Sequence, residues 1–189
     1  MPAALAALAD LAVTLSFERT AGDEIQGLLS DPLSVVTAIT RLTRLSGWRI
    51  GIGAGTVDSP VPASTRAARG PAYLAARAAI DVARGAPAEL ALALPPGVSG
   101  AAYGEVVEAA KDAEAALWLL RTVLSRRSEE GWELMDLLDK GLTNARAAER
   151  LGISPSAVSQ RLSRASRIEV DRGSKLAARL LGRMQEVAQ

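Results

Sequence analysis

The sequence from Gly141 to Ala165 contains the signals for two short helices joined by a tight turn. Thr143 is a good N-cap residue for the first helix, and Gly152 follows at the point where a tight turn needs a positive φ. Ser154 then caps a second helix, and Pro155 suits the first position of that helix because this position needs no amide hydrogen. The turn and the two caps therefore restrict this part of the chain to a closely packed helical pair.

The apolar residues of this segment fit the same arrangement. Ala148, in a first helix expected over 145–151, is small where the two helices must cross. Ile153 fills the space between the helices, and Val158 and Leu162 face inward. The exposed face of the second helix carries side chains that hydrogen-bond to base edges and phosphates, namely Ser156, Ser159, Gln160, Ser163 and Arg164.

This segment resembles the helix-turn-helix of bacterial transcription factors and of sigma-factor-like regions. The resemblance implies that Ser154–Arg164 is the recognition helix and that nearby arginines contact phosphates, which give affinity without sequence choice. An ordinary helical hairpin with a solvated polar face is the alternative interpretation. The residues expected to bind DNA are Thr143, Arg146, Arg150, Ser154, Ser156, Ser159, Gln160, Arg161, Ser163, Arg164 and Arg167. Four further basic residues of the last helix either extend this phosphate track or solvate a dimer helix: Arg172, Lys175, Arg179 and Arg183.

The distribution of charge favours a polyanionic partner for the C-terminal part of the chain. The whole chain has a net charge of only +1. Residues 1–139 carry 12 basic and 17 acidic side chains, whereas residues 140–189 carry 10 basic and 4 acidic side chains. A basic segment attached to an acidic body is expected to be the part that meets double-stranded DNA.

The chain contains no cysteine and no histidine, which excludes several classes of chemistry. Zinc sites built on these residues, cysteine nucleophiles, Ser-His-Asp triads and disulfides are ruled out. We predict no catalytic residue, no metal site and no cofactor. The sequence shows no secretion signal and no stretch of about 20 apolar residues, so a cytoplasmic location without a membrane partner is expected.

The rest of the chain predicts a mixture of helices and strands. Helices are expected over 3–11, 72–84, 99–127, 129–139 and 173–187, and another begins at Asp31-Pro32. Strands are expected over 12–17 and 25–29, as a hairpin with its tip at Gly22-Asp23, and over 48–57 and 89–94. The glycines of the strand over 48–57 suggest the close approach of another group. The apolar stripe of the last helix is predicted to consist of Leu176, Leu180, Met184 and Val187.

Apolar residues in the long helix over 99–127 recur with heptad spacing. This seam consists of Val106, Ala110, Ala113, Leu117, Leu120 and Leu124. Two interpretations stay open: the seam covers the sheet or the next domain, or it is a dimerising or signalling surface between two domains. The seam and the last helix are the candidate dimer surfaces.

Three segments of the N-terminal half together resemble a known arrangement. They are FERTAGDEIQGLL at 17–29, WRIGIGAGTV at 48–57 and RGPAYLAARAAI at 69–80. Their order is similar to that in class III nucleotide cyclases and diguanylate cyclases. The GDE-x-Q-G hairpin resembles that of the SatD-like family, whose members look like degenerate cyclase domains. The resemblance implies an α+β fold whose N-terminal domain is ferredoxin-like and cyclase-like.

The same resemblance implies roles for particular residues. Asp23 matches a metal-binding aspartate, Arg19 the position that reads the base, and Arg77 the arginine that stabilises the transition state. Tyr73 stands where cyclases have an asparagine, and the strand that carries the second metal-binding aspartate is not found, so no cyclisation is expected. A hairpin held by ion pairs is the simpler explanation of these residues, and a pocket for a nucleotide or another small anion is the sharper one. The residues of that pocket would be Arg19, Asp23, Glu24, Arg66, Arg69 and Arg77.

These observations lead to one expected organisation. A cyclase-like α+β domain covers 1–98, a long connecting helix covers 99–127, and a helix-turn-helix domain with a C-terminal helix covers 128–189. We expect a homodimeric, sequence-specific transcriptional regulator whose N-terminal domain senses a ligand or mediates assembly. The alternatives are a nucleotide-processing enzyme, such as a nucleotide cyclase, fused to a DNA-binding module, and a partner-binding protein that never meets DNA.

Overall fold

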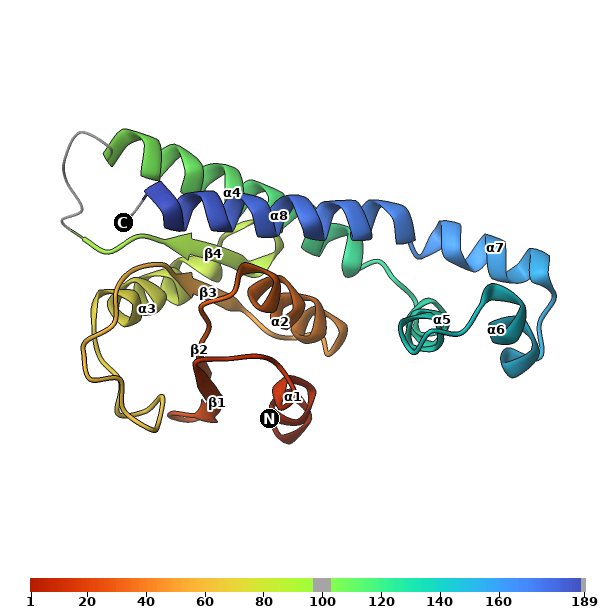
Figure 1. Ribbon diagram of the computed structural model, residues 1–189, viewed down its shortest axis with the longest axis horizontal. Helices are drawn as coiled ribbons and strands as arrows, with labels where there is room; N and C mark the ends of the chain where they lie inside the picture. The colour runs from red at the N-terminus through yellow and green to blue at the C-terminus, as the bar shows by residue number, and fades with distance from the viewer. Residues whose placement is uncertain (97–102, 188–189) are drawn as a thin grey trace.

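The computed structural model describes residues 1–96 and 103–187, and it contains the expected mixture of helices and short strands (Figure 1). Its elements are α1 (Pro2–Leu8), β1 (Leu15–Arg19), β2 (Ile25–Leu28), α2 (Pro32–Arg44), β3 (Ile50–Gly53), α3 (Pro71–Ala83), a short 3-10 helix (Pro87–Glu89), β4 (Leu90–Ala93), α4 (Tyr103–Leu124), α5 (Glu129–Asp139), α6 (Asn144–Leu151), α7 (Pro155–Arg164) and α8 (Arg167–Val187). The predicted start of the long helix, at 99–102, lies outside the described residues. Within the described ranges, no helix is both long enough and apolar enough to cross a membrane.

The molecule is elongated, with a mixed body at one end and three short helices at the other (Figure 1). In the body, α2 and α3 lie beside the strands, and α4 and α8 run side by side in opposite directions above them. Helices α5, α6 and α7 lie beyond the far end of α4. The strands and the predicted helix-turn-helix are therefore at opposite ends of the long axis.

The four strands form two separate pairs. β1 and β2 make the predicted antiparallel hairpin, in which Leu15 pairs with Leu28 and Gly22 turns with a φ of 54°. β3 and β4 pair in parallel, with Ile50 opposite Leu90. No strand among the described residues joins the two pairs, so the ferredoxin-like, cyclase-like sheet implied by the resemblance is not confirmed.

Glycines in β3 allow α3 to pack directly on this strand. A Cβ atom on Gly51 would lie 2.5 Å from the backbone nitrogen of Ile80, and one on Gly53 would overlap the backbone of Ala72 and Ala76. The group whose close approach these glycines indicated is therefore a helix.

The substitution Gly51→Ala is expected to lower the free energy of unfolding by about 3 kcal/mol, because the clash is with helix backbone and no side chain can turn away to relieve it. Gly85→Ala is the matched control, since a Cβ there meets no atom within 4 Å. Urea unfolding of the two variants measures the difference. Equal midpoints would mean that α3 moves away from β3 at little cost.

Polar side chains of α4 cover the open edge of β4. The indole of Trp118 donates to a backbone oxygen of this strand at 2.7 Å, and the carboxylate of Glu114 accepts from one of its N–H groups at 2.8 Å. The guanidinium of Arg121, in a residue that is 6% exposed, donates to the backbone oxygen of Glu89 at 2.7 Å. Burial lowers the pKa of Arg121. These contacts hold α4 across the strand pair and prevent its edge from pairing with another strand.

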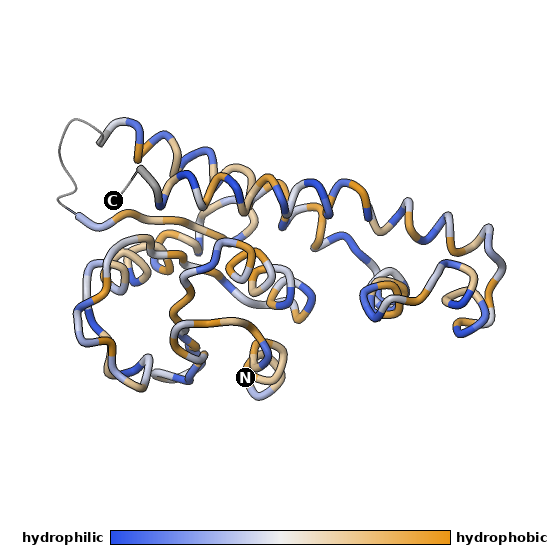
Figure 2. Tube along the Cα trace, in the orientation of Figure 1, coloured by the Kyte–Doolittle hydropathy of each residue, from blue (hydrophilic) through white to orange (hydrophobic). Residues whose placement is uncertain are grey.

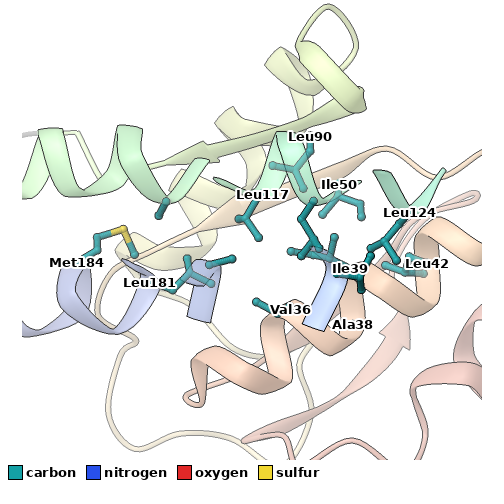
Figure 3. Packing of buried hydrophobic residues seen from close by; sticks show 14 of the residues in the cluster. Val36, Ala38, Ile39, Leu42, Ile50, Leu90, Leu117, Leu124, Leu181 and Met184 are labelled. Atoms are coloured by element: carbon teal, nitrogen blue, oxygen red, sulfur yellow. The ribbon is translucent and has the colours of Figure 1, made fainter. Parts of the chain in front are cut away.

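The heptad seam of α4 is buried inside the chain. All six seam residues are buried, and five of them belong to a core shared with α2, β3, β4 and α8 (Figure 3). Leu117 and Leu124 are 0% and 1% exposed. The seam therefore covers the strands and α8, as the first interpretation stated. The prediction that it is a dimer surface is wrong, because no seam residue is free to meet a second chain.

Helix α8 begins at Arg167, six residues before the predicted start, and packs along α4 and α2. Hydropathy alternates along this helix in Figure 2, as expected for a helix with one buried face. The predicted stripe is wrong at Leu176, which is 44% exposed, and the side chain of Val187 lies outside the described residues. The buried face consists of Val170, Ala177, Leu181 and Met184. This face is occupied within the chain, so it too cannot serve as a dimer surface.

Candidate nucleic-acid interface

Helices α5, α6 and α7 form a compact unit around a small core of their own. Leu134 and Met135 of α5, Ala147 and Ala148 of α6, and Val158 of α7 are buried in this core. Half-buried residues complete it: Leu137, Leu138, Leu151, Ile153 and Leu162. All four residues that were predicted to pack between the two helices belong to this core.

The turn and both caps have the predicted geometry. The hydroxyl of Thr143 accepts from the backbone N–H three residues later at 3.3 Å, and that of Ser154 accepts in the same way at 3.1 Å. Gly152 is left-handed, with φ 64° and ψ 32°. α6 begins at Asn144, one residue before the predicted start. The local chemistry of the caps therefore places α7 at a fixed angle to α6.

The polar face of α7 points away from the core. The five residues predicted on this face are all exposed: Ser156, Ser159, Gln160, Ser163 and Arg164. Ser156, Gln160 and Arg164 lie one turn apart on the side opposite the buried Val158. The hydroxyl of Ser159 donates to the backbone oxygen of Pro155 at 3.2 Å, so it is partly engaged within the helix. The side chains of this face therefore carry amide, guanidinium and hydroxyl groups that point into solvent.

Arginines are also present on the outside of α6 and α7. Arg146 and Arg150 are exposed one turn apart on α6, and Arg161 is half-buried in the last turn of α7. Arg167, at the start of α8, has a side chain that is 34% exposed and an Nε 3.6 Å from Asp171. Arg167 is therefore less available for a phosphate than its position in the sequence indicated.

A hollow of about 580 Å³ lies beside the start of α6. Thr143, Asn144, Ser159, Ser163 and Arg167 are among the residues that line it. The first turn of a helix leaves backbone N–H groups unpaired, and its dipole favours an anion there. The structure thus brings four predicted DNA-binding residues together around one surface depression, whose lining also includes Glu169.

The four basic residues of α8 are exposed, but this helix leads from α7 back to the body (Figure 1). A helix rises about 1.5 Å per residue, so Arg183 lies roughly 16 Å farther along α8 than Arg172. The structure therefore favours the interpretation that most of these side chains solvate the outer face of α8.

A stack of side chains joins the three-helix unit to the body. The ring of Trp132 of α5 contacts two guanidinium groups, with the central carbon of Arg44 at 5.3 Å and that of Arg127 at 4.4 Å from the ring centroid. Arg44, the last residue of α2, also forms an ion pair with Asp136, with N–O distances of 2.6 and 2.8 Å. The hydrogen bond to Asp136 raises the pKa of Arg44. Helix α2 of the body is therefore tied directly to α5.

Arg127 connects the same stack to the end of α7. Its Nε and Nη2 donate to the backbone oxygen of Ala165, which caps the end of α7, at 3.1 and 2.8 Å. Burial lowers the pKa of Arg127. Gly131 leaves room for this side chain, because a Cβ there would lie 2.9 Å from its Cγ. This joint was not predicted from the sequence, in which its only signal is a tryptophan in a mostly polar stretch.

The residues of the predicted ligand pocket are only partly brought together. Arg77 forms an ion pair with Glu24 at 2.8 Å, and the hydrogen bond that it donates to this carboxylate raises the pKa of Arg77. Arg19 donates to a backbone oxygen of the hairpin turn at 2.6 Å, and Asp23 is exposed at the tip. Arg69 donates to two backbone oxygens of its own loop. All except Arg19 line one cavity of the body, and the ion pair agrees with the simpler explanation of these residues.

The three-helix unit is similar to a known family of domains. Residues 133–169 match the winged helix-turn-helix DNA-binding family. The three-helix unit therefore resembles a helix-turn-helix DNA-binding domain. The match runs from α5 through α7 into the first turn of α8, so it includes the predicted recognition helix. No curated protein and no solved structure matches the chain.

The structure departs from the family description in one respect. A wing is a β-hairpin that follows the recognition helix, whereas here α7 is followed directly by α8, and no strand occurs in the described part of the chain after Arg164. The similarity therefore concerns the three-helix core. It does not extend to the N-terminal half, so the SatD-like resemblance is not confirmed.

Proposed function

We propose that this protein is a sequence-specific DNA-binding regulator of transcription that reads base edges with α7. The observation that carries the proposal is the exposed polar face of α7, held opposite the buried Val158 by caps at both ends of the turn. Gln160 and Arg164 have the planar hydrogen-bonding groups that recognise adenine and guanine in the major groove. Arg146 and Arg150 of α6 supply phosphate contacts that position the domain.

We extend the proposal to a homodimer, because dimeric helix-turn-helix proteins read two half-sites about 34 Å apart. The dimer surface has to lie outside the buried seam. The exposed Leu119 of α4 and Leu176 of α8, at 71% and 44% exposure, make the outer faces of these helices the candidates. A palindromic target site is the expected consequence.

In this proposal, residues 1–98 sense a small anionic or nucleotide effector, 99–127 connect, and 128–189 bind DNA. The burial of α8 against α4 and α2 supports such a link, because a helix that follows the DNA-binding unit is part of the body core. The ion pair of Arg77 with Glu24 favours a sensor over an enzyme, because this arginine is already engaged by a carboxylate.

The test uses purified protein and sheared DNA from the genome of its source. Fragments retained at moderate salt are sequenced and searched for a shared site. Enrichment of one palindromic sequence is the expected result. Retention of fragments without any shared site would contradict sequence-specific binding, and no retention at all would contradict DNA binding.

The double substitution Arg146→Ala and Arg150→Ala is expected to weaken binding to every DNA sequence alike. Each phosphate contact contributes about 0.9 to the slope of log affinity against log salt, so the slope should fall by about 2 for each protomer. Fluorescence anisotropy at several salt concentrations measures this slope. The matched control, Arg84→Ala with Lys111→Ala, removes two exposed charges from the body and should leave it unchanged. An unchanged slope in the α6 variant would place the phosphate contacts elsewhere.

A further inference from the structure

A large cavity lies inside the N-terminal body, between the β1–β2 hairpin and helices α2 and α3. Its volume is about 1250 Å³, and β3 and the loop before α3 also line it. Sites for small organic ligands usually have volumes of about 300–1,000 Å³. The cavity is therefore large enough to hold such a molecule.

Three residues that line this cavity have buried hydroxyl oxygens for which no hydrogen-bond partner is found among the described residues. They belong to Thr20 directly after β1, to Thr65 in the loop and to Tyr73 in the first turn of α3. Thr65 is 1% exposed, so bulk water does not satisfy its hydroxyl. Burial raises the pKa of Tyr73, and the nearby Thr65 hydroxyl limits this rise without forming a well-aligned hydrogen bond. A buried polar group without a hydrogen-bond partner destabilises the free protein, and a ligand with an acceptor group would remove that penalty.

The part of the cavity lined by Thr20, Thr65 and Tyr73 is called its polar end here. Two contacts hold the walls of this polar end together. The carboxylate of Glu18 on β1 accepts from the Ser64 hydroxyl at 2.6 Å and from the backbone N–H of Arg66 at 3.3 Å. These hydrogen bonds lower the pKa of Glu18, and the charge of Arg66 adds a smaller effect in the same direction. The ion pair of Arg77 with Glu24 ties α3 to the hairpin on the other side. The polar end is therefore braced by the hairpin, the loop and α3 together.

The charges on the cavity wall favour an anion. Five arginines and three carboxylates line the cavity: Arg49, Arg66, Arg69, Arg77, Arg84, Asp23, Glu24 and Asp81. Arg69 and Arg77 are engaged by backbone oxygens and by Glu24. For the Arg66 guanidinium, next in sequence to Thr65, no hydrogen bond or ion pair is found with the side chains of residues 1–96 or 104–185. Among the described residues, no hydrogen bond or ion pair is found for the Arg84 guanidinium either, but Arg84 follows the end of α3, roughly 16 Å along the helix from Tyr73. At the end of the cavity that holds Thr65 and Tyr73, Arg66 is therefore the one cation without such a partner, which suits a single negative charge.

The rest of the cavity wall is largely apolar. Phe17 and Ile25 of the hairpin, Val35 of α2, Ile52 of β3 and Ile80 of α3 contribute to it. A fully polar ligand would bury polar atoms against these apolar side chains without hydrogen bonds, which is unfavourable. An apolar part of a ligand would instead be removed from water there, which is favourable.

We propose that this cavity binds a small monoanion with an apolar body, such as a medium-chain or aromatic carboxylate. The anionic head lies between the Arg66 guanidinium and the hydroxyls of Thr20, Thr65 and Tyr73, and the body lies along the apolar walls. The role of this ligand as an effector rests on the proposed function. The cavity adds to that function the chemical class of the effector. A nucleoside triphosphate fits less well, because it brings several negative charges to a polar end at which Arg66 is the one unengaged cation.

The experiment measures binding of 8-anilinonaphthalene-1-sulfonate to the full chain without DNA. This probe carries one sulfonate, and its fluorescence rises when its rings leave water. We expect saturable binding and competition by octanoate at concentrations at least about 10-fold lower than by octanol, its uncharged analogue. Arg66→Gln and Thr65→Val are each expected to weaken binding of the probe and of octanoate about 10-fold. Arg126→Gln is the matched control, because Arg126 is exposed and lies outside the cavity.

Three results would overturn the proposal: unchanged binding in Arg66→Gln and Thr65→Val, competition by octanol equal to that by octanoate, or displacement by ATP at lower concentrations than octanoate. Thr65→Val keeps the shape of the side chain, and urea midpoints of all variants establish that they remain folded. DNA affinity is measured on the same proteins. DNA binding without probe binding contradicts only the cavity proposal, and probe binding without DNA binding contradicts only the proposed function.

Discussion

Replacing Gln160, Arg161 and Arg164 together with alanine is expected to lower the affinity for the enriched DNA site at least about 100-fold. Each side chain that bonds a base edge well contributes about 1–3 kcal/mol of discrimination, and about 1.4 kcal/mol corresponds to a tenfold change. Affinity for unrelated DNA should fall much less, because Arg146 and Arg150 still contact phosphates. Fluorescence anisotropy with one specific and one unrelated duplex measures both changes.

The control for this variant is again Arg84→Ala with Lys111→Ala, which removes the same amount of positive charge from the body. Gln160 and Arg164 are exposed and Arg161 is half-buried, so the free energy of unfolding should stay within about 0.5 kcal/mol. If both duplexes lose affinity equally, or if the control loses as much as the triple variant, α7 does not read sequence.

The helix-turn-helix could be predicted from the sequence because local chemistry determines it. The caps at Thr143 and Ser154, the left-handed Gly152 and the buried Val158 act between residues that are close in the chain. Such signals do not depend on how the rest of the protein folds. The structure confirms all four and moves the start of the first helix by a single residue, to Asn144.

The buried face of α8 could not be predicted in the same way, because its partners lie on α4 and α2, far away in the sequence. Leu176 repeats with Leu180 and Met184 at helical spacing, so periodicity alone favoured it. Packing instead buries Ala177 and Leu181. Where two helices approach closely, a small alanine fits the contact and a neighbouring leucine stays outside, so hydropathy is a poor guide in an alanine-rich helix.

The pairing of the strands and the polar end of the cavity depend on contacts of the same long range. Motifs in the hairpin and in β3 indicate strands, but they do not determine which edges meet. Arg77 and Glu24 are 53 residues apart, so the sequence suggested ion pairs at the hairpin without showing which two side chains meet. The unpartnered hydroxyl of Thr65 carries no sequence signal, because only burial distinguishes it from a loop threonine on the surface.

The other large effect is expected at Arg127. Arg127→Ala removes two hydrogen bonds to the backbone oxygen of Ala165 and the contact with the ring of Trp132. We expect a loss of about 2–3 kcal/mol in unfolding free energy, and a DNA affinity about 10-fold lower under conditions where the protein remains folded, since the end of α7 is released. Arg127→Lys should restore little, because an ammonium cannot stack on the ring and form both bonds together.

Because the chain contains no cysteine, spin labels can be attached at introduced cysteines alone. Release of the three-helix unit from the body can then be measured as a change in the distance between two labels. Glu105→Cys on α4 and Glu149→Cys on α6, both at exposed positions, carry spin labels in the body and in the three-helix unit. Pulsed electron resonance should give one narrow distance distribution with Arg127 present and a broad one in Arg127→Ala. Arg126→Ala, a change at the exposed neighbouring arginine, should leave it narrow. A narrow distribution and full DNA affinity in Arg127→Ala would mean that the packing of α8 on α4 orients α7 without help. Because α8 is packed along α4 and α2 independently of Arg127, a broad distribution with an intact core would locate the motion at the joint between Ala165 and Arg127.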